Sequence, residues 1–185
     1  KFTDGVFFHQ ILDEIAQDYP DIECEFYIAD IGIARVGAKP EDFDVVVTQN
    51  MYGDISSDVV GEAMGSIGLN GSANIGEKFA MFEAVHGTAP LIAGQNKANP
   101  SGLLMASVMM LNYLGQNDVA ETIQNAWLKT LEDGFHTGDI YKPAEEKTLL
   151  GQLQGLLSGK KDIPAQLTGT AEFSKAVIER IGQKP

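Results

Sequence analysis

The chain has 185 residues, 44% of them hydrophobic, which is enough for a sizeable core in one domain or in parts of two. Its formal net charge of -13 argues against binding to the phosphate backbone of nucleic acid. No apolar run approaches the ~20 residues of a membrane span. We therefore expect a soluble globular protein without nucleic-acid or membrane partners. The single cysteine, Cys24, fits a reducing compartment, either the cytoplasm or the mitochondrial matrix of a eukaryote.

The first third of the chain predicts alternating helices and strands. After Thr3, apolar residues recur at helical spacing and predict a helix that ends near Pro20. Residues 22–30 and 44–50, IECEFYIAD and DVVVTQN, are rich in β-branched and aromatic side chains, which is typical of strands. The first of these strands would carry Asp30 at its end and lead into a short helix. Another helix is expected directly after the second strand.

The rest of the chain continues the same alternation. Residues 65–78 are rich in glycine and predict a loop-rich connection, a candidate crossing between domains. Residues 78–87 predict a strand that runs into a turn. Helices are predicted from 99 to 114, from 118 to 134 and from 171 to 182, whereas residues 145–169 are weakly patterned. Strands alternating with helices predict an α/β fold.

Two aspartates follow the second predicted strand at helical spacing. Asp54 and Asp58 are four residues apart, so both carboxylates lie on one face of a helix and repel each other unless a cation offsets the repulsion. Asp30 is available as a third carboxylate. An all-oxygen set of this kind suits Mg²⁺ or Mn²⁺ rather than zinc. On spacing alone, a helix cap is the commoner explanation for such an aspartate, and it stays open here.

The run EAVHGTAP, residues 83–90, has the features of a nucleotide-binding turn. Small residues after a strand let the backbone approach a ligand closely, and His86 can stack on or hydrogen-bond to an adenine ring. The usual dinucleotide fingerprint, G-x-G-x-x-G after a strand, is absent. On the residues alone, a structural histidine in a turn is the alternative.

Three runs resemble the β-decarboxylating dehydrogenase family, which contains the isocitrate and isopropylmalate dehydrogenases. They are NMYGDISSD at 50–58, SANIGEKFAMFEAVHGTAP at 72–90 and IAGQNKANPSGLLMASVMMLNYLG at 92–115. The likeness covers most of residues 1–139 and resumes at 170–182, while residues near 144–168 are not placed. NxYGD, ANIG and FEAVHGTAP look like isocitrate dehydrogenase, because isopropylmalate enzymes favour NxFGD and FEPVHGSAP.

The resemblance implies the isocitrate/isopropylmalate dehydrogenase-like α/β fold without its N-terminal part. Residues 1–64 would belong to the small, dimer-interface domain, and residues 65–185 to the large cofactor-binding domain. The family's catalytic Lys and Tyr would lie upstream of Lys1, so no catalytic residue beyond the metal ligands is assigned. The fragment alone is expected to be inactive.

The resemblance also assigns roles to residues of this chain. Asp54 and Asp58 would bind Mg²⁺ or Mn²⁺ in one subunit, and Asp30 would reach the neighbour's site across a dimer interface. A homodimer or higher homo-oligomer with shared metal sites is therefore expected. The implied cofactor-binding residues are Glu83 near the nicotinamide, His86, Gly87, Thr88, Ala89, Pro90, Leu91 and Ile92 beside the adenosine, and Asn99 at the adenine.

The expected activity is metal-dependent oxidative decarboxylation of isocitrate to 2-oxoglutarate. NADP-using members of the family typically place Lys-Tyr after the HGTAP turn, and NAD-using members often place Asp-Ile there. Leu91 fits neither pattern, but Ile92 and Ala98 resemble the NAD pattern, so NAD is expected, with NADP as the alternative. Rival activities are those of isopropylmalate and homoisocitrate dehydrogenase. A non-catalytic regulatory subunit of a hetero-oligomeric isocitrate dehydrogenase is a further rival, against which the complete set of three aspartates argues.

Overall fold

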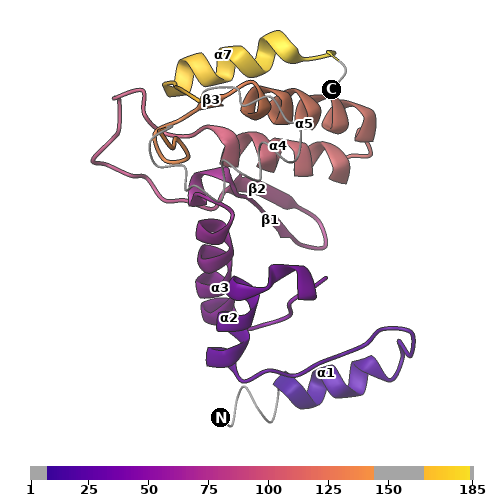
Figure 1. Ribbon diagram of the computed structural model, residues 1–185. Helices are drawn as coiled ribbons and strands as arrows, with labels where there is room; N and C mark the ends of the chain where they lie inside the picture. Colours follow the sequence, from indigo (N-terminus) through magenta and orange to yellow (C-terminus); the bar gives the residue numbers. More distant parts are fainter. Residues whose placement is uncertain (1–7, 144–164, 184–185) are drawn as a thin grey trace, which may run out of the picture. The chain divides into compact units, whose positions relative to one another are not determined.

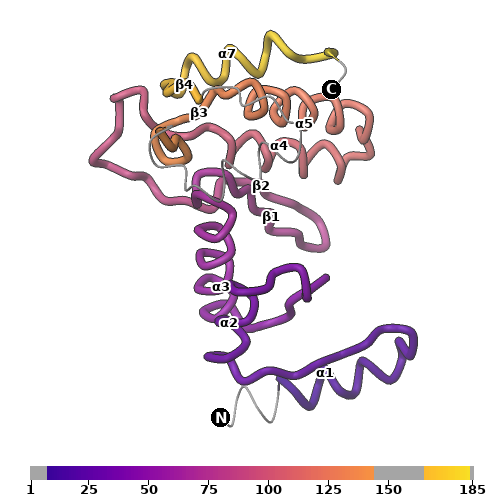
Figure 2. The backbone as a smooth tube through the Cα atoms, viewed as in Figure 1, coloured from indigo at the N-terminus to yellow at the C-terminus, as the bar shows by residue number. Residues whose placement is uncertain are grey.

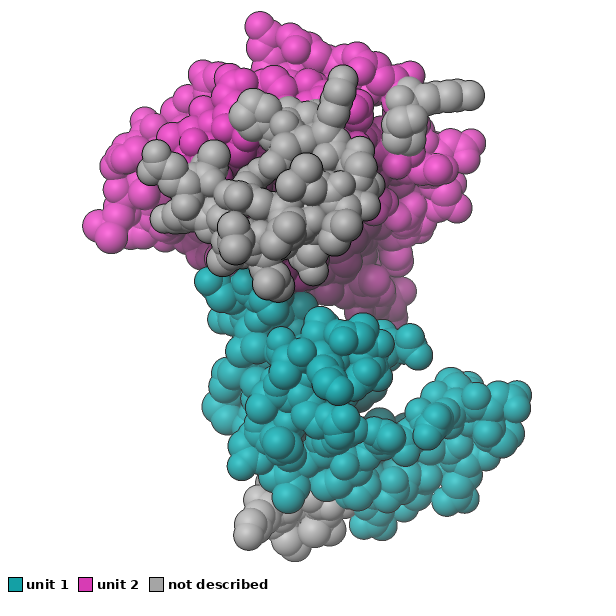
Figure 3. Space-filling model, in the orientation of Figure 1, with its two compact units in different colours: residues 1–63 teal, residues 64–185 magenta. Residues whose placement is uncertain are grey.

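A computed structural model describes residues 8–143 and 165–183 of the chain (Figure 1). The chain divides into two compact units, Lys1–Ala63 and Met64–Pro185 (Figure 3). That these parts correspond to a small domain and a large cofactor-binding domain stays a prediction. In the described ranges, no helix has the length and apolar character that crossing a membrane requires.

The regular structure described in the first unit is helical. Its elements are α1 (His9–Ala16), α2 (Ala29–Ala38), the short 3-10 helix η2 (Pro40–Asp42) and α3 (Asn50–Ala63). Helix α2 packs on α3, and Gly37 allows the close approach, because a Cβ at that position would lie 2.7 Å from a methyl carbon of Val59. The helices predicted near residue 10, after residue 30 and after residue 50 are confirmed, although the expected start at Thr3 lies outside the described residues.

Both strands predicted for this unit are wrong. Residues 23–28 and 45–49 adopt no regular structure, and Asp30 lies in the first turn of α2 instead of at a strand end. Val45, at the start of the second segment, is 79% exposed. A β-branched run forms a strand only where a neighbouring strand supplies its hydrogen bonds. In the described part of the chain, neither segment has such a neighbour.

The second unit contains a hairpin packed against a stack of helices. Strand β1 (Gly71–Ile75) pairs antiparallel with β2 (Ala80–Ala84), so that Gly71 lies opposite Ala84. Helix α4 (Ser101–Tyr113) packs on this hairpin, α5 (Asn117–Glu132) packs on α4, and α7 (Thr170–Arg180) packs on α5 (Figure 2). The short strands β3 (Phe135–His136) and β4 (Gln166–Leu167) pair in parallel. All three helices predicted for this part of the chain are confirmed.

The glycine-rich stretch 65–78, predicted as loop-rich, instead contains β1 and the short 3-10 helix η3 (Ile67–Leu69). Two of its glycines, Gly68 and Gly71, serve close packing. A Cβ on Gly71 would lie 2.4 Å from the backbone nitrogen of Ala106, so β1 sits directly against α4. Similarly, a Cβ on Gly102 of α4 would lie 2.8 Å from the carbonyl oxygen of Asn70. Because Gly71 and Gly102 have no side chains, the hairpin can pack directly against α4. The strand predicted at 78–87 is confirmed as β2.

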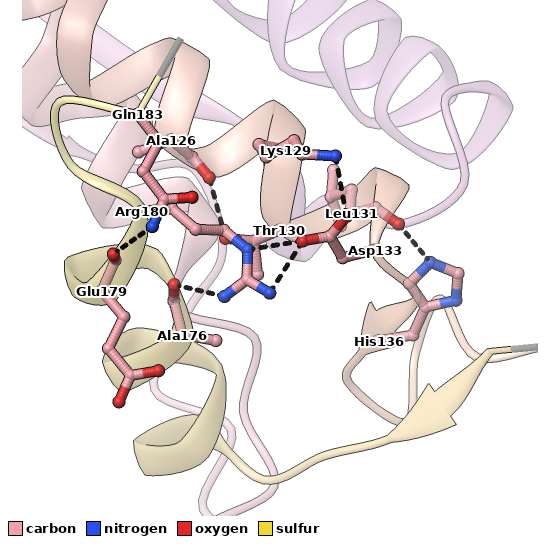
Figure 4. Close-up of polar contacts among 10 residues, drawn as sticks. All are labelled: Ala126, Lys129, Thr130, Leu131, Asp133, His136, Ala176, Glu179, Arg180 and Gln183. Atoms are coloured by element: carbon pink, nitrogen blue, oxygen red, sulfur yellow. Dashed lines mark hydrogen bonds and ion pairs between the residues drawn. The ribbon is translucent and has the colours of Figure 1, made fainter. Parts of the chain in front are cut away.

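The hydrophobic core of this unit lies between α5 and α7. Phe173 is fully buried against Ala126 and Val177, with Leu104, Trp127, Leu131 and Phe135 packed around them. An ion group joins the last turn of α7 to the residue that follows α5 (Figure 4). Nε and Nη2 of Arg180 each lie 2.8 Å from Oδ2 of Asp133, whose Oδ1 lies 2.8 Å from Nζ of Lys129. Apolar packing and this ion group together hold α7 in place.

Candidate functional site

Strand β2 leads into the turn to which the sequence assigns the cofactor. Glu83 is exposed on β2 and accepts a hydrogen bond of 3.0 Å from Nδ2 of Asn74 on β1. Half-buried His86 follows two residues after the strand, with Nδ1 3.0 Å from the carbonyl oxygen of Gly87. The residues that complete the turn are exposed: Gly87, Thr88, Ala89 and Pro90. The hairpin thus presents a continuous polar and small-residue surface.

The turn contains backbone strain. Ala89 has a φ of +42°, in the left-handed region that an L side chain rarely adopts, at a cost of about 1 kcal/mol or more. The backbone continues in a tight turn, because the N–H of Ile92 donates to the carbonyl of Ala89 at 3.0 Å. Leu91 is 88% exposed between them. Strained positions persist where surrounding contacts fix them, and they concentrate at ligand sites.

The loop that follows the turn ends in a buried polar cluster. Asn99 is only 6% exposed, and both polar atoms of its side chain have partners. Its Oδ1 accepts the N–H of Ser101 at 3.0 Å, which caps α4, and its Nδ2 donates to Oδ2 of Asp139 at 3.0 Å. The hydroxyl of Thr137 donates to the other oxygen of Asp139 at 2.6 Å. Asn99, which is predicted to bind the adenine, therefore also caps the N-terminus of α4.

Asp139 is a functional candidate that the sequence pattern did not reveal. Burial by itself raises the pKa of this carboxyl, but hydrogen bonds from Ser66, Thr137 and Asn99 outweigh burial and hold the pKa below its usual value. Asp139 is therefore a carboxylate that orients Asn99. The available signal was a lone aspartate between a glycine and apolar residues after a short strand, which is too common to single out.

The predicted metal ligands lie on the helices of the first unit. Asp54 and Asp58 are exposed one turn apart on α3, and Oδ2 of Asp54 accepts a hydrogen bond of 2.8 Å from Nδ2 of Asn50. Asp30 is exposed in the first turn of α2, where its Oδ1 accepts the N–H of Ile31 at 2.7 Å. Carboxylate oxygens of this kind suit a hard divalent cation.

These three carboxylates do not form a complete metal site within one chain. Among the residues that the structure describes, no three acidic, histidine or cysteine side chains are close enough together to hold an ion. Asp54 and Asp58 can supply two ligands, and the others must come from elsewhere. The sharing of a site between subunits, which the sequence resemblance implies for Asp30, stays a prediction.

Comparison with known proteins assigns this fold and these residues to a family. The model of the isocitrate/isopropylmalate dehydrogenase family matches residues 1–151. The isocitrate dehydrogenase (NADP) of Rickettsia bellii is 56% identical over 185 residues, which is 100% of this chain and 34% of the relative. Subunit 2 of the mitochondrial isocitrate dehydrogenase (NAD) of Saccharomyces cerevisiae is 41% identical over 98% of this chain and 44% of its own length.

A solved structure agrees with these relatives. The crystal structure of isocitrate dehydrogenase from Methylococcus capsulatus matches with a TM-score of 0.80 and 38% identity, over 95% of this chain and 46% of that chain. The chain belongs to the isocitrate/isopropylmalate dehydrogenase family and has part of the family's fold. The resemblance and fold class predicted from the sequence are confirmed. The chain spans about a third of the length of the Rickettsia relatives that it matches.

Proposed function

We propose that the native protein carrying this chain oxidatively decarboxylates isocitrate to 2-oxoglutarate and CO₂, with hydride transfer to a nicotinamide dinucleotide. The observation that carries the proposal is the pair of exposed carboxylates, Asp54 and Asp58, one turn apart on α3. Like charges so placed are unfavourable without a cation. They occur in a chain that is 56% identical along its whole length to an isocitrate dehydrogenase.

Residues of the two units would perform separate tasks. Asp54 and Asp58 would hold Mg²⁺ or Mn²⁺, which when bound supplies Lewis-acid polarisation of the substrate's oxygens. The 2.8 Å hydrogen bond from Asn50 orients the Asp54 carboxylate. In the second unit, the exposed turn at residues 86–90 would bind the adenosine. Gly87 helps there, because the space that a Cβ would occupy is open to a ligand.

The names of the related enzymes indicate which dinucleotide the protein prefers. Ile92 and Ala98 favoured NAD, yet five Rickettsia relatives that are 53–56% identical over the whole chain carry NADP in their names. A related Saccharomyces subunit, at 41% identity, carries NAD. Likeness over 185 residues outweighs an argument from two positions. We therefore propose NADP as the preferred cofactor, with NAD as the alternative.

The substrate and cofactor are tested directly on the native protein. We expect reduction of NADP with isocitrate in the presence of Mg²⁺ or Mn²⁺, and a higher kcat/KM for NADP than for NAD. Activity with isopropylmalate alone would overturn the substrate assignment. A requirement for a second, different chain would instead support the regulatory-subunit alternative.

The metal ligands are tested by substitution. Asp54→Asn should lower metal-dependent turnover by about 100-fold or more, because one of the charges that hold the cation is lost. Dinucleotide affinity should stay unchanged, since the turn at residues 86–90 is untouched. The matched control is Glu121→Gln, which removes an exposed carboxylate from α5 and should leave turnover unchanged.

The same variants test whether the metal site is shared in a homodimer. If Asp54 and Asp30 of one site come from different subunits, mixed dimers of Asp54→Asn and Asp30→Asn contain one intact site. Re-associating equal amounts of the two inactive variants should then restore about a quarter of the parent activity. If each subunit supplies all of its own ligands, mixing restores nothing and the sharing is refuted.

A further inference from the structure

The N-terminus of α7 is capped by a residue that lies far away in the sequence. Gly169 occupies the cap position of α7 and has no side chain to satisfy the first backbone N–H groups. Asn96 does so instead. Its side-chain Oδ1 accepts the N–H of Ala171 at 2.8 Å, and its main-chain carbonyl accepts the N–H of Thr170 at 3.2 Å.

Further contacts fix Asn96 in this position. Its Nδ2 donates to Oε2 of Glu172 at 2.8 Å, so one side-chain amide contacts both the backbone and a carboxylate of the first turn of α7. The Thr170 hydroxyl donates to the carbonyl of Ala98. A Cβ on Gly169 would lie 2.7 Å from the main-chain carbonyl oxygen of Asn96, so the absence of a side chain lets the loop and the helix meet closely.

Asn96 belongs to the loop that contains the proposed cofactor residues. This loop leaves β2 at Ala84, passes through the exposed turn at residues 86–90, and reaches α4 at Ser101. Its middle is thinly packed, since Leu91 is 88% exposed. Asn96 itself has a φ of +56°, in the left-handed region that asparagine adopts more readily than most other residues. The contacts to α7 therefore anchor the loop between the turn and the buried Asn99.

We propose that Asn96 is a positioning residue for the dinucleotide. By capping α7 it holds residues 86–92 in the conformation that binds the adenosine, so that α7 and the cofactor turn are energetically coupled. The inference rests on the proposed function, because it requires the dinucleotide to bind this turn. A loop held in its binding conformation loses less conformational freedom on binding, which increases affinity. Coupling is reciprocal, so the bound dinucleotide must also stabilise the first turn of α7.

The test compares dinucleotide binding in variants of the native protein. Asn96→Ala should raise the Kd and the KM for the dinucleotide about tenfold, while kcat and the KM for isocitrate change less than about twofold. Asn96→Asp should also weaken binding, because the new carboxylate faces Glu172. Adding Glu172→Gln to Asn96→Asp should restore affinity, since the new amide can donate to the new carboxylate across the same gap.

A matched control separates positioning from general stability. Arg180→Ala removes the ion pair with Asp133 (Figure 4) and so loosens the last turn of α7, whereas Asn96 contacts the first turn. We expect it to lower Tm about as much as Asn96→Ala does, with an unchanged Kd for the dinucleotide. Hydrogen exchange adds a second readout. Dinucleotide should slow exchange of the Ala171 amide in the parent and in Arg180→Ala, but not in Asn96→Ala.

The outcomes are distinguishable. An unchanged Kd in Asn96→Ala would overturn the positioning role, and so would an equal rise in Kd in Asn96→Ala and Arg180→Ala, which indicates a stability effect only. Failure of the parent protein to bind dinucleotide would overturn the proposed function and, with it, this inference. The inference is supported by a tenfold rise in Kd in Asn96→Ala that Arg180→Ala does not show, together with weaker binding in Asn96→Asp that the added Glu172→Gln restores.

Discussion

At the scale of single residues, Asp139 is the charge on which the end of the loop between β2 and α4 depends. It accepts hydrogen bonds from Asn99 and Thr137, which are both buried, although Asp139 itself is exposed. An ionised group in such a place stabilises the fold because its donors are already arranged around it. Removing the charge leaves those donors without an equivalent acceptor.

Asp139→Asn should therefore destabilise the second unit by about 1–3 kcal/mol, because an amide offers one acceptor oxygen where the carboxylate offers two. Urea unfolding of the native protein measures the loss, and Glu121→Gln serves as the exposed control. An unchanged unfolding midpoint in Asp139→Asn would contradict the role given to this carboxylate.

The same residue makes stability depend on pH. The pKa of Asp139 is lowered from the usual 3.8 in the folded state, so its contribution is present above about pH 4 and is lost as pH falls through the lowered pKa. The pKa of Asp133 is lowered as well, by hydrogen bonds from Lys129 and Arg180. We expect the urea midpoint of the parent to fall on acidification below about pH 4, and to fall less steeply in Asp139→Asn.

At the scale of elements, the contact between β1 and α4 depends on a missing side chain. A Cβ on Gly71 would lie only 2.4 Å from the backbone nitrogen of Ala106, which leaves a methyl group no room. Gly71→Ala should therefore cost about 1–3 kcal/mol of stability, because the hairpin must shift from the helix. Gly76→Ala is the control in the same hairpin, since its Cβ would lie 3.4 Å from the carbonyl oxygen of Phe79. Thermal unfolding distinguishes the two, and equal Tm values would contradict the packing argument.

The helices were predictable because their signals are local. The apolar positions and the terminal glycine of α7, for instance, lie within a short stretch of the chain. Strands are harder, because a strand needs a partner that its own sequence does not specify. Residues 44–50 have strand composition without strand structure, whereas β1 is a strand despite its glycine, serine and asparagine. Amino-acid composition alone therefore led to the wrong secondary structure for both segments.

The candidate site shows the same contrast between residues with local sequence signals and residues whose contacts are distant in the chain. The turn at residues 86–90 and the pair Asp54 and Asp58 could be found as short motifs. Asn96 and Asp139 could not, because their contacts span 75 and 40 residues and become visible only when the loop, α4 and α7 are placed in space. Motifs identify the groups that would touch a ligand, whereas the residues that hold them are found by packing.

At the scale of the whole molecule, the two units differ in how much apolar surface they bury. In the second unit Phe173, Ala126 and Val177 form a buried cluster. In the described part of the first unit, Val36 is the buried hydrophobic residue, while Val45 and Ile28 are largely exposed. Local stability follows buried apolar contacts, so the units should open at different free energies.

Hydrogen exchange on the isolated 185-residue chain measures this difference. Amides of α2 and α3 should exchange at least about tenfold faster than those of α4, α5 and α7, because little buried core holds the first pair. Both sets of helices are measured in one sample, so differences in pH or temperature do not affect the comparison of their exchange rates. Equal protection in both sets of helices would show that packing between α2 and α3 suffices.

The placement of Leu91 has a practical consequence for protein engineering. It lies at the position where the family's cofactor-choosing residues are expected, it is almost fully exposed, and the loop is anchored on either side by β2 and by Asn96. Substitutions at exposed sites away from such anchors usually change stability by less than about 0.5 kcal/mol. We therefore expect that libraries varying Leu91 can test whether this position sets cofactor preference, with little loss of stability.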